Sequence, residues 1–211
     1  MRLIPLALLL ASSFWLAGCS DKPAGQAGND GTMQLSPVDS AFKNTDVTGL
    51  GYARDFALTD HNGKPRTLAD FKGKAVLVFF GFTHCPDVCP TTLAEMANVM
   101  QQLGPQADKV QVLFVSVDPE RDTPELLAKY VPAFHPSFLG LVGDKAATEK
   151  VAKEFRVFYQ KVPGKDAGSY TVDHTAGSYV FDPQGRIRLF VRHGQGAEPI
   201  AHDLKLLLAG K

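Results

Sequence analysis

Residues 75–90 read AVLVFFGFTHCPDVCP, an apolar run that ends abruptly in a polar segment with two cysteines. The first eight positions do not alternate between apolar and polar residues, and this pattern predicts a strand buried on both faces. We expect a helix over about 91–103, because a Gly-Pro pair follows it. Cys85 and Cys89 therefore lie at the carboxyl end of a buried strand, where binding sites gather in α/β sheets.

Strand and helix patterns alternate through the rest of the chain from residue 51. A second apolar run at 110–117 predicts another buried strand, and Thr123 with Pro124 predicts a helix start. The order of the elements and the place of the cysteines predict an α/β, thioredoxin-like fold, with a central mixed sheet flanked by helices and an added N-terminal hairpin. The other expected elements are a strand and tight turn at 56–63, a strand at 138–141, a helix from Asp144 to about 155, a polar loop at 161–173, a hairpin at 177–192 and a helix at 198–208.

The first 50 residues are interpreted as targeting and tether segments. Residues 1–18 have a basic start and an apolar run too short to span a membrane, which is typical of a secretory signal peptide. Residues 16–19 read LAGC and resemble a bacterial lipobox, which implies cleavage before Cys19 and lipidation of its thiol. The alternative is an ordinary signal peptide with a chance cysteine. Residues 19–50 are polar and rich in glycine, so they predict a flexible membrane tether and leave 51–211 as one domain.

Charge and cysteine content narrow the class of protein further. The chain has 22 basic and 22 acidic residues and no basic stripe, which argues against a nucleic-acid partner. Of its three cysteines, only Cys85 and Cys89 remain if Cys19 carries lipid. A disulfide across so short a loop restricts the unfolded chain little, so its stabilising effect is small. The pair is therefore expected to take part in chemistry rather than to staple the fold.

A C-x-x-x-C pair has three interpretations: a structural disulfide, a redox dithiol or part of a metal site. Redox enzymes of the thioredoxin type usually have two residues between the cysteines, which argues moderately against a general oxidoreductase. The nearby helix N-terminus predicts that at least one thiol has a lowered pKa. In a thioredoxin-like fold, the loop that carries His174 lies beside the cysteine loop. Two thiolates and one imidazole suit Cu(I), whereas zinc prefers four ligands.

Three ordered blocks resemble the Sco/SenC family. They are VFFGFTHCPDVCPTT at 78–92, SVDPERDTP at 116–124 and VDHT at 172–175, within a resemblance that covers about 55–208. The resemblance implies a thioredoxin fold and copper, as Cu(I) or Cu(II), held by Cys85, Cys89 and His174. It also implies delivery of that copper, taken from an upstream periplasmic donor, to the CuA centre of cytochrome c oxidase subunit II. Some members are thought to reduce the cysteines of their target instead.

Several roles remain open beside the three implied ligands. Asp173 either orients His174 by a hydrogen bond or caps its loop, while Asp118 and Asp122 are interpreted as turn and capping residues. The five other histidines have no metal-ligand spacing to the cysteines and are expected to be solvated or hydrogen-bonded locally.

Four functions compete. The first is a metallochaperone, and the second is a periplasmic thiol–disulfide oxidoreductase that uses a Cys85–Cys89 disulfide. The third is a peroxide reductase, although no clear peroxidatic motif surrounds Cys85. The fourth is a binding domain with a structural disulfide. The metallochaperone is preferred, and the chain is expected in the bacterial cell envelope, anchored by lipid and facing the periplasm.

Overall fold

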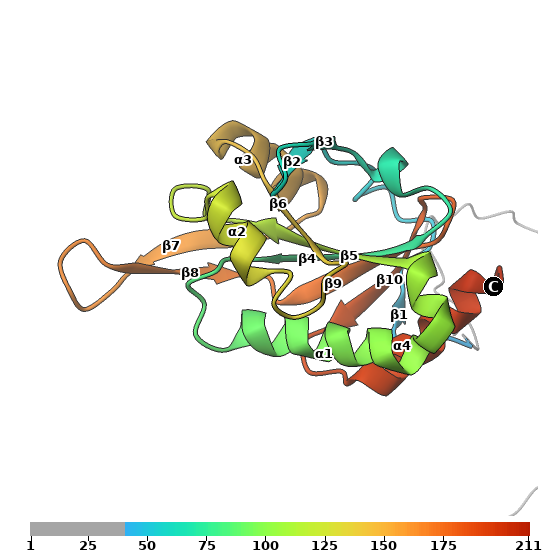
Figure 1. Cartoon of the computed structure of the whole chain (residues 1–211). Helices are drawn as coiled ribbons and strands as arrows, with labels where there is room; N and C mark the ends of the chain where they lie inside the picture. Colours follow the sequence, from blue (N-terminus) through green and yellow to red (C-terminus); the bar gives the residue numbers. More distant parts are fainter. Residues whose placement is uncertain (1–40) are drawn as a thin grey trace, which may run out of the picture. The chain divides into compact units, whose positions relative to one another are not determined.

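The computed structural model describes residues 41–211 (Figure 1). Its centre is an eight-stranded mixed sheet with the strand order β1-β10-β9-β4-β5-β6-β2-β3. The predicted signal peptide, Cys19 and the first part of the predicted tether, up to residue 40, lie outside the described residues. Within 41–211, every helix is too short or too polar to cross a bilayer.

The sheet is mixed, as predicted, with a parallel centre and antiparallel edges. Strand β4 pairs in parallel with β5 and antiparallel with β9, and β5 pairs in parallel with β6. The strands are β1 (Thr45–Asp46), β2 (Leu58–Asp60), β3 (Pro65–Arg66), β4 (Ala75–Gly81), β5 (Val110–Ser116), β6 (Leu139–Val142), β9 (Gly177–Phe181) and β10 (Ile187–Arg192).

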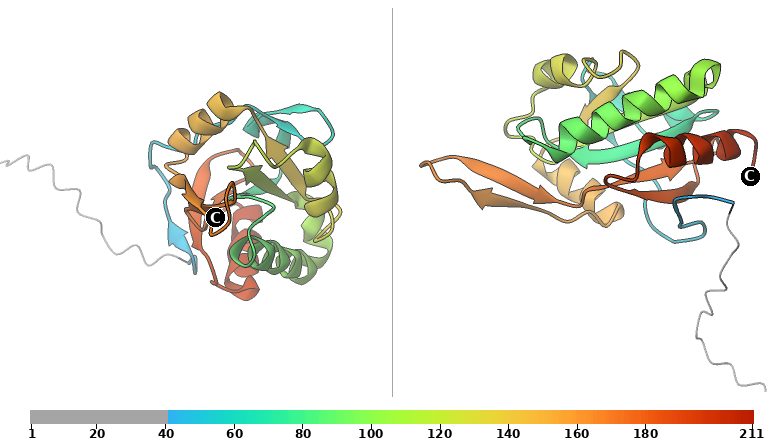
Figure 2. Two further views of the ribbon diagram at one scale, coloured as in Figure 1. Left: turned by 90° about the vertical axis from the view of Figure 1, so that its left-hand side faces the viewer. Right: turned by 90° about the horizontal axis from the view of Figure 1, so that it is seen from below.

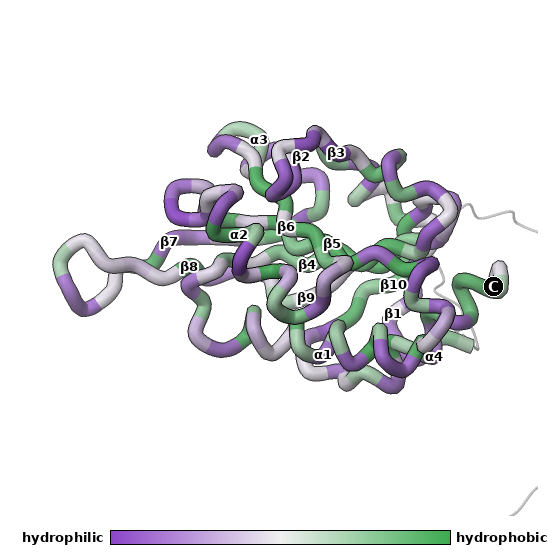
Figure 3. Tube along the Cα trace, viewed as in Figure 1, coloured by the Kyte–Doolittle hydropathy of each residue, from purple (hydrophilic) through white to green (hydrophobic). Residues whose placement is uncertain are grey.

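The two apolar runs behave as the sequence predicts. Every residue of β4 and β5 is buried, because helices cover both faces of these central strands. Figure 3 shows the same strands as the most hydrophobic part of the trace. Helices α1 (Val88–Leu103) and α4 (Ala197–Leu208) lie side by side on one face, and α3 (Lys145–Glu154) lies on the other (Figure 2).

Helix starts follow their capping residues. The Thr123 hydroxyl accepts a hydrogen bond from the Leu126 amide at the start of α2 (Pro124–Tyr130), and Asp144 caps α3 in the same way. Both caps are confirmed. Helix α1 begins at residue 88, three residues earlier than expected. Pro90 is tolerated there because the first turn of a helix has no intrahelical partner for its amide groups.

The segment predicted as a polar loop at 161–173 is instead a hairpin. Strands β7 (Tyr159–Pro163) and β8 (Tyr170–His174) pair with each other as a separate two-stranded sheet that projects from the domain (Figure 1). Most of β7 and β8 is exposed or only partly buried, and Val172 is their one buried residue, so the apolar alternation is too short to mark a strand on a core. The prediction of a loop was therefore wrong.

The domain also begins upstream of residue 51. Strand β1 pairs with β10, and Val47 is buried. The buried carboxylate of Asp203, on α4, accepts hydrogen bonds from the amides of Lys43 and Asn44. Residues 41–50 were expected to belong to the tether, but the structure shows them fixed on the folded domain.

Candidate metal centre

Three elements bring the predicted ligands together. Cys85 lies in the loop after β4, Cys89 in the first turn of α1, and His174 is the last residue of β8. One ligand atom from each residue lies within 4.8 Å of the other two. Cys89 is fully buried, while Cys85 and His174 are partly exposed. The hairpin that the sequence analysis missed is thus the element that carries the histidine.

Gly81 makes room for the buried sulfur. A Cβ atom at this last residue of β4 would lie only 2.8 Å from Cys89 Sγ and 2.8 Å from a ring carbon of Phe114. No larger residue fits there without moving the sulfur. Sequence reasoning missed this role, because a glycine at a strand end by itself indicates only a turn.

The imidazole of His174 is held in one orientation. Its Nδ1 donates a hydrogen bond to the Thr175 carbonyl oxygen at 3.0 Å, since a carbonyl only accepts. The lone pair of Nε2 is left to face Cys89 Sγ at 3.6 Å. Burial lowers the pKa of His174, and the bond to Thr175 only partly opposes that effect. The ring is therefore neutral near pH 7, which is the state that binds a metal.

The two thiols differ in their electrostatics. Burial raises the pKa of the Cys89 thiol far above its usual range, and a hydrogen bond from the Phe82 backbone opposes this only in part. The expectation that at least one thiol has a lowered pKa is not met at Cys89, because burial is the largest influence on that thiol. Cys85 Sγ accepts a hydrogen bond from the Cys89 amide at 3.5 Å. A metal that displaces the Cys89 proton would supply the positive charge that a buried thiolate needs.

Both cysteines are free thiols, so the structure describes the dithiol form of the site. The Cys85–Cys89 disulfide stays a prediction.

Asp173 does not orient the histidine through a hydrogen bond. It is exposed, and the alternation along β8 places it on the opposite face of the hairpin from His174. Among the described residues, no hydrogen bond joins the two side chains, and the Thr175 carbonyl has the orienting role instead.

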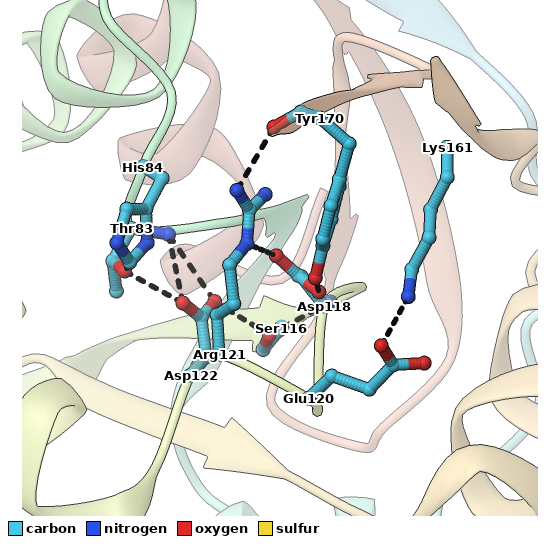
Figure 4. Close-up of polar contacts among 9 residues, drawn as sticks. All are labelled: Thr83, His84, Ser116, Asp118, Glu120, Arg121, Asp122, Lys161 and Tyr170. Carbon is cyan, nitrogen blue, oxygen red and sulfur yellow. Dashed lines mark hydrogen bonds and ion pairs between the residues drawn. The ribbon is translucent and has the colours of Figure 1, made fainter. Parts of the chain in front are cut away.

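A buried polar cluster supports the cysteine loop (Figure 4). The Asp122 carboxylate accepts hydrogen bonds from the Thr83 amide and hydroxyl, the latter at 2.6 Å, and from the Ser116 hydroxyl at 2.6 Å. Burial raises the pKa of Asp122 despite these bonds. The interpretation as a turn or capping residue was incomplete, because Thr123 caps α2 while Asp122 holds the start of the cysteine loop. The contact joins residues 39 positions apart, which no local pattern reveals.

Comparison with known proteins places the chain in a family. The family described as SCO1/SenC matches residues 46–209. The chain belongs to the SCO1/SenC family. A mitochondrial SCO2 homolog from Bos taurus is 41% identical over 157 residues, which cover 74% of this chain and 59% of that protein. The chain thus spans about three fifths of the length of this relative.

Two solved SCO1/SenC structures are similar over nearly their whole length. Copper-bound ScoI from Bradyrhizobium japonicum is 49% identical, with a TM-score of 0.67 over 72% of this chain and 97% of that one. The apo Sco1 protein from Thermus thermophilus is 44% identical, with a TM-score of 0.68 over 78% of this chain and 98% of that one. The thioredoxin-like fold predicted from the sequence is confirmed.

The donor set of this SCO1/SenC chain suits copper. Two sulfurs and one imidazole nitrogen are soft and intermediate ligands of the kind that Cu(I) prefers, whereas a structural zinc ion needs a fourth ligand. Within residues 41–211, these are the only three Cys, His or acidic residues close enough to share an ion. His84, His135 and His202 make local hydrogen bonds, as expected, with Thr83, Ser137 and Asp203. His61 and His193 instead bond residues far away in the sequence, Gly140 and Thr92.

Proposed function

We propose that this protein is a metallochaperone that binds copper and delivers it to the CuA centre of cytochrome c oxidase subunit II during assembly of the oxidase. The convergence of Cys85, Cys89 and His174 within 4.8 Å is the observation that carries the proposal. Family membership and the copper-bound ScoI relative support it. An upstream periplasmic protein supplies the copper, which is cargo rather than a resident cofactor.

Each ligand has a distinct part in this function. Cys89 holds the ion from the buried side, and Gly81 leaves its sulfur the space to do so. His174 offers Nε2 as a neutral donor because Nδ1 is engaged by a carbonyl. Cys85, the more accessible thiol, is the donor that an acceptor's ligands reach.

Copper binding by the reduced protein tests the proposal. The native protein is expected to take up one copper and, as Cu(II), to show thiolate-to-copper charge transfer. His174→Ala should bind far more weakly, because it removes one of three donors. His135→Ala is the matched control, since the hydrogen bonds of the His135 ring go only to Ser137. Equal binding by the native protein and His174→Ala would mean that His174 is no ligand.

A thiol–disulfide oxidoreductase is the second candidate function. One observation favours it: a partly exposed thiol lies beside a buried one, as suits an attacking and a resolving cysteine on a thioredoxin-like fold. Reduction of an oxidised CuA-site peptide distinguishes the candidates. An oxidoreductase needs both cysteines and is indifferent to His174→Ala, whereas a metallochaperone loses its copper transfer in that variant.

We also propose that the chain works at the bacterial cell envelope, facing the periplasm. Residues 1–18 act as the signal peptide, Cys19 carries the lipid, and the segment from Cys19 to residue 40 belongs to the tether. Membrane fractionation of native protein and Cys19→Ser tests the anchor. The native protein should sediment with membranes, and the variant should become soluble in the periplasm. Equal partitioning of the two would refute lipidation at Cys19.

A further inference from the structure

The hairpin that carries His174 needs support from outside itself. Strands β7 and β8 form a two-stranded sheet apart from the main one, and such ribbons are marginally stable alone. One end is fixed where the Thr175 amide donates to the Phe158 carbonyl and the chain enters β9 at Gly177. Tyr170 begins β8 at the other end. If the Tyr170 end were not held, strand β8 could tilt relative to the main sheet, and His174 would move with it.

A closed ring of three residues holds that other end; we call Asp118, Arg121 and Tyr170 the brace (Figure 4). Arg121 Nε donates to one oxygen of Asp118, and Arg121 Nη1 donates to the Tyr170 carbonyl at 2.9 Å. The Tyr170 hydroxyl donates to the second oxygen of Asp118 at 2.8 Å. The guanidinium carbon lies 3.6 Å from the centroid of the Tyr170 ring.

Two residues of the brace, Asp118 and Arg121, lie in the turn after β5 that also supports the cysteine loop. Asp122, next in the chain after Arg121, holds Thr83 at the start of the cysteine loop. Arg121 itself lies over the Phe82 ring at 5.8 Å, and that ring packs edge-on against His174. One short turn after β5 therefore contacts both ligand-bearing elements.

The chemistry of the brace suits positioning better than stability. Asp118 is fully buried, and Arg121 Nη2 is buried without a hydrogen-bond acceptor among the described residues. A buried ion pair often stabilises a fold no more than apolar residues of the same size, because desolvation offsets the attraction. What the ring of bonds does specify is geometry, since a guanidinium donates in fixed directions.

We propose that Arg121 is a positioning residue, which holds the β7–β8 hairpin against the turn after β5 and thereby sets the distance between His174 and the two thiols. The inference deepens the proposed function, because it concerns the same three ligands. It also makes a claim about the metal-free protein, which is testable whether or not copper is the cargo.

The test compares two matched double variants. Asp118→Asn/Arg121→Met removes both Arg121 bonds of the brace without leaving a buried carboxylate unpaired. Asp182→Asn/Arg186→Met removes an ion pair from the turn between β9 and β10; its carboxylate is as buried as that of Asp118, while Arg186 is exposed. We expect amide hydrogen exchange in β8 of the metal-free protein to be about tenfold faster in the first variant only. Copper loss from the loaded protein should accelerate by a similar factor, again in the first variant only.

The outcomes separate the two ideas. Unchanged β8 exchange in a folded brace variant would overturn the inference, and so would faster exchange without faster copper loss. If the native protein binds no copper, the proposed function fails, while the exchange rates still decide whether the brace holds the hairpin. Should the double variant unfold, Tyr170→Phe removes only the phenol bond. It should give a smaller increase in both rates, and no increase would overturn the inference.

Discussion

Gly81→Ala should damage the thiol site more than it damages the fold. The added Cβ would lie 2.8 Å from Cys89 Sγ, whereas an ordinary van der Waals contact needs at least about 3.5 Å. The sulfur must therefore move by about 0.7 Å, because the strand backbone is fixed by neighbours on both sides. Such overpacking costs about 1–3 kcal/mol of unfolding free energy, or a fall in Tm of about 2–12 °C for a domain of this size.

The effect on copper is separable from the effect on stability. A displaced Cys89 sulfur no longer meets His174 Nε2 and Cys85 Sγ at a common point, so copper affinity should fall by about 10- to 100-fold. Competition with a chromophoric Cu(I) chelator measures that affinity, and urea unfolding measures the stability.

Gly140→Ala provides the matched control. Gly140 is a buried glycine of β6, and its Cβ would crowd Leu127 at 3.0 Å and Val131 at 3.2 Å, with no thiol among the nearest atoms. It should lose a similar amount of stability and keep native copper affinity. If Gly81→Ala binds copper as tightly as Gly140→Ala, the reasoning about the space beside Cys89 is refuted.

Three further results are expected. Iodoacetamide should modify Cys85 of the reduced, metal-free protein well before Cys89, because Cys89 is fully buried and its pKa is raised. Acid should destabilise the native protein more than His174→Gln, since the lowered pKa of His174 means that only the unfolded chain binds its proton as the pH falls from about 6.5. Asp203→Asn should cost about 1–3 kcal/mol and expose residues 41–47 to proteolysis, because it weakens the anchor of this segment.

Each of these has a clear contrary outcome. Equal alkylation rates at the two thiols would show that burial does not distinguish them. Identical loss of stability by the native protein and His174→Gln between about pH 7 and pH 5 would contradict the lowered histidine pKa. An unchanged cleavage pattern in Asp203→Asn would show that strand pairing alone holds the N-terminal segment.

Strong local signals predicted the core correctly. The continuous apolar runs of β4 and β5 indicate by themselves that both faces of these strands are buried. Thr123 and Asp144 mark helix starts because their side chains bond amides three residues later. The ligand cluster was predictable only with a fold in mind, since His174 is 85 positions from Cys89.

The misses share a physical cause. The two strands of the hairpin at 159–174 bury only Val172, and strand β1 is exposed, so hydrophobic periodicity gives little sign of them. The roles of Gly81, Arg121 and Asp122 come from contacts between distant segments, and the identity of each residue alone suggests only a turn or a surface charge. The raised pKa of Cys89 depends on how deeply the first turn of α1 is buried, which the sequence does not state.

The unequal burial of the two thiols means that the site has one side open to solvent and one side closed by the protein interior. In the proposed function, a ligand arriving from an acceptor protein would meet the partly exposed Cys85, while the fully buried Cys89 faces the interior. An ion held here is therefore expected to exchange its bonds to this protein for bonds to the acceptor one at a time. The bond to Cys85 would be exchanged first and the bond to Cys89 last. The fold, rather than the acceptor, would then dictate the order of bond breaking, and the ion would remain coordinated throughout its passage.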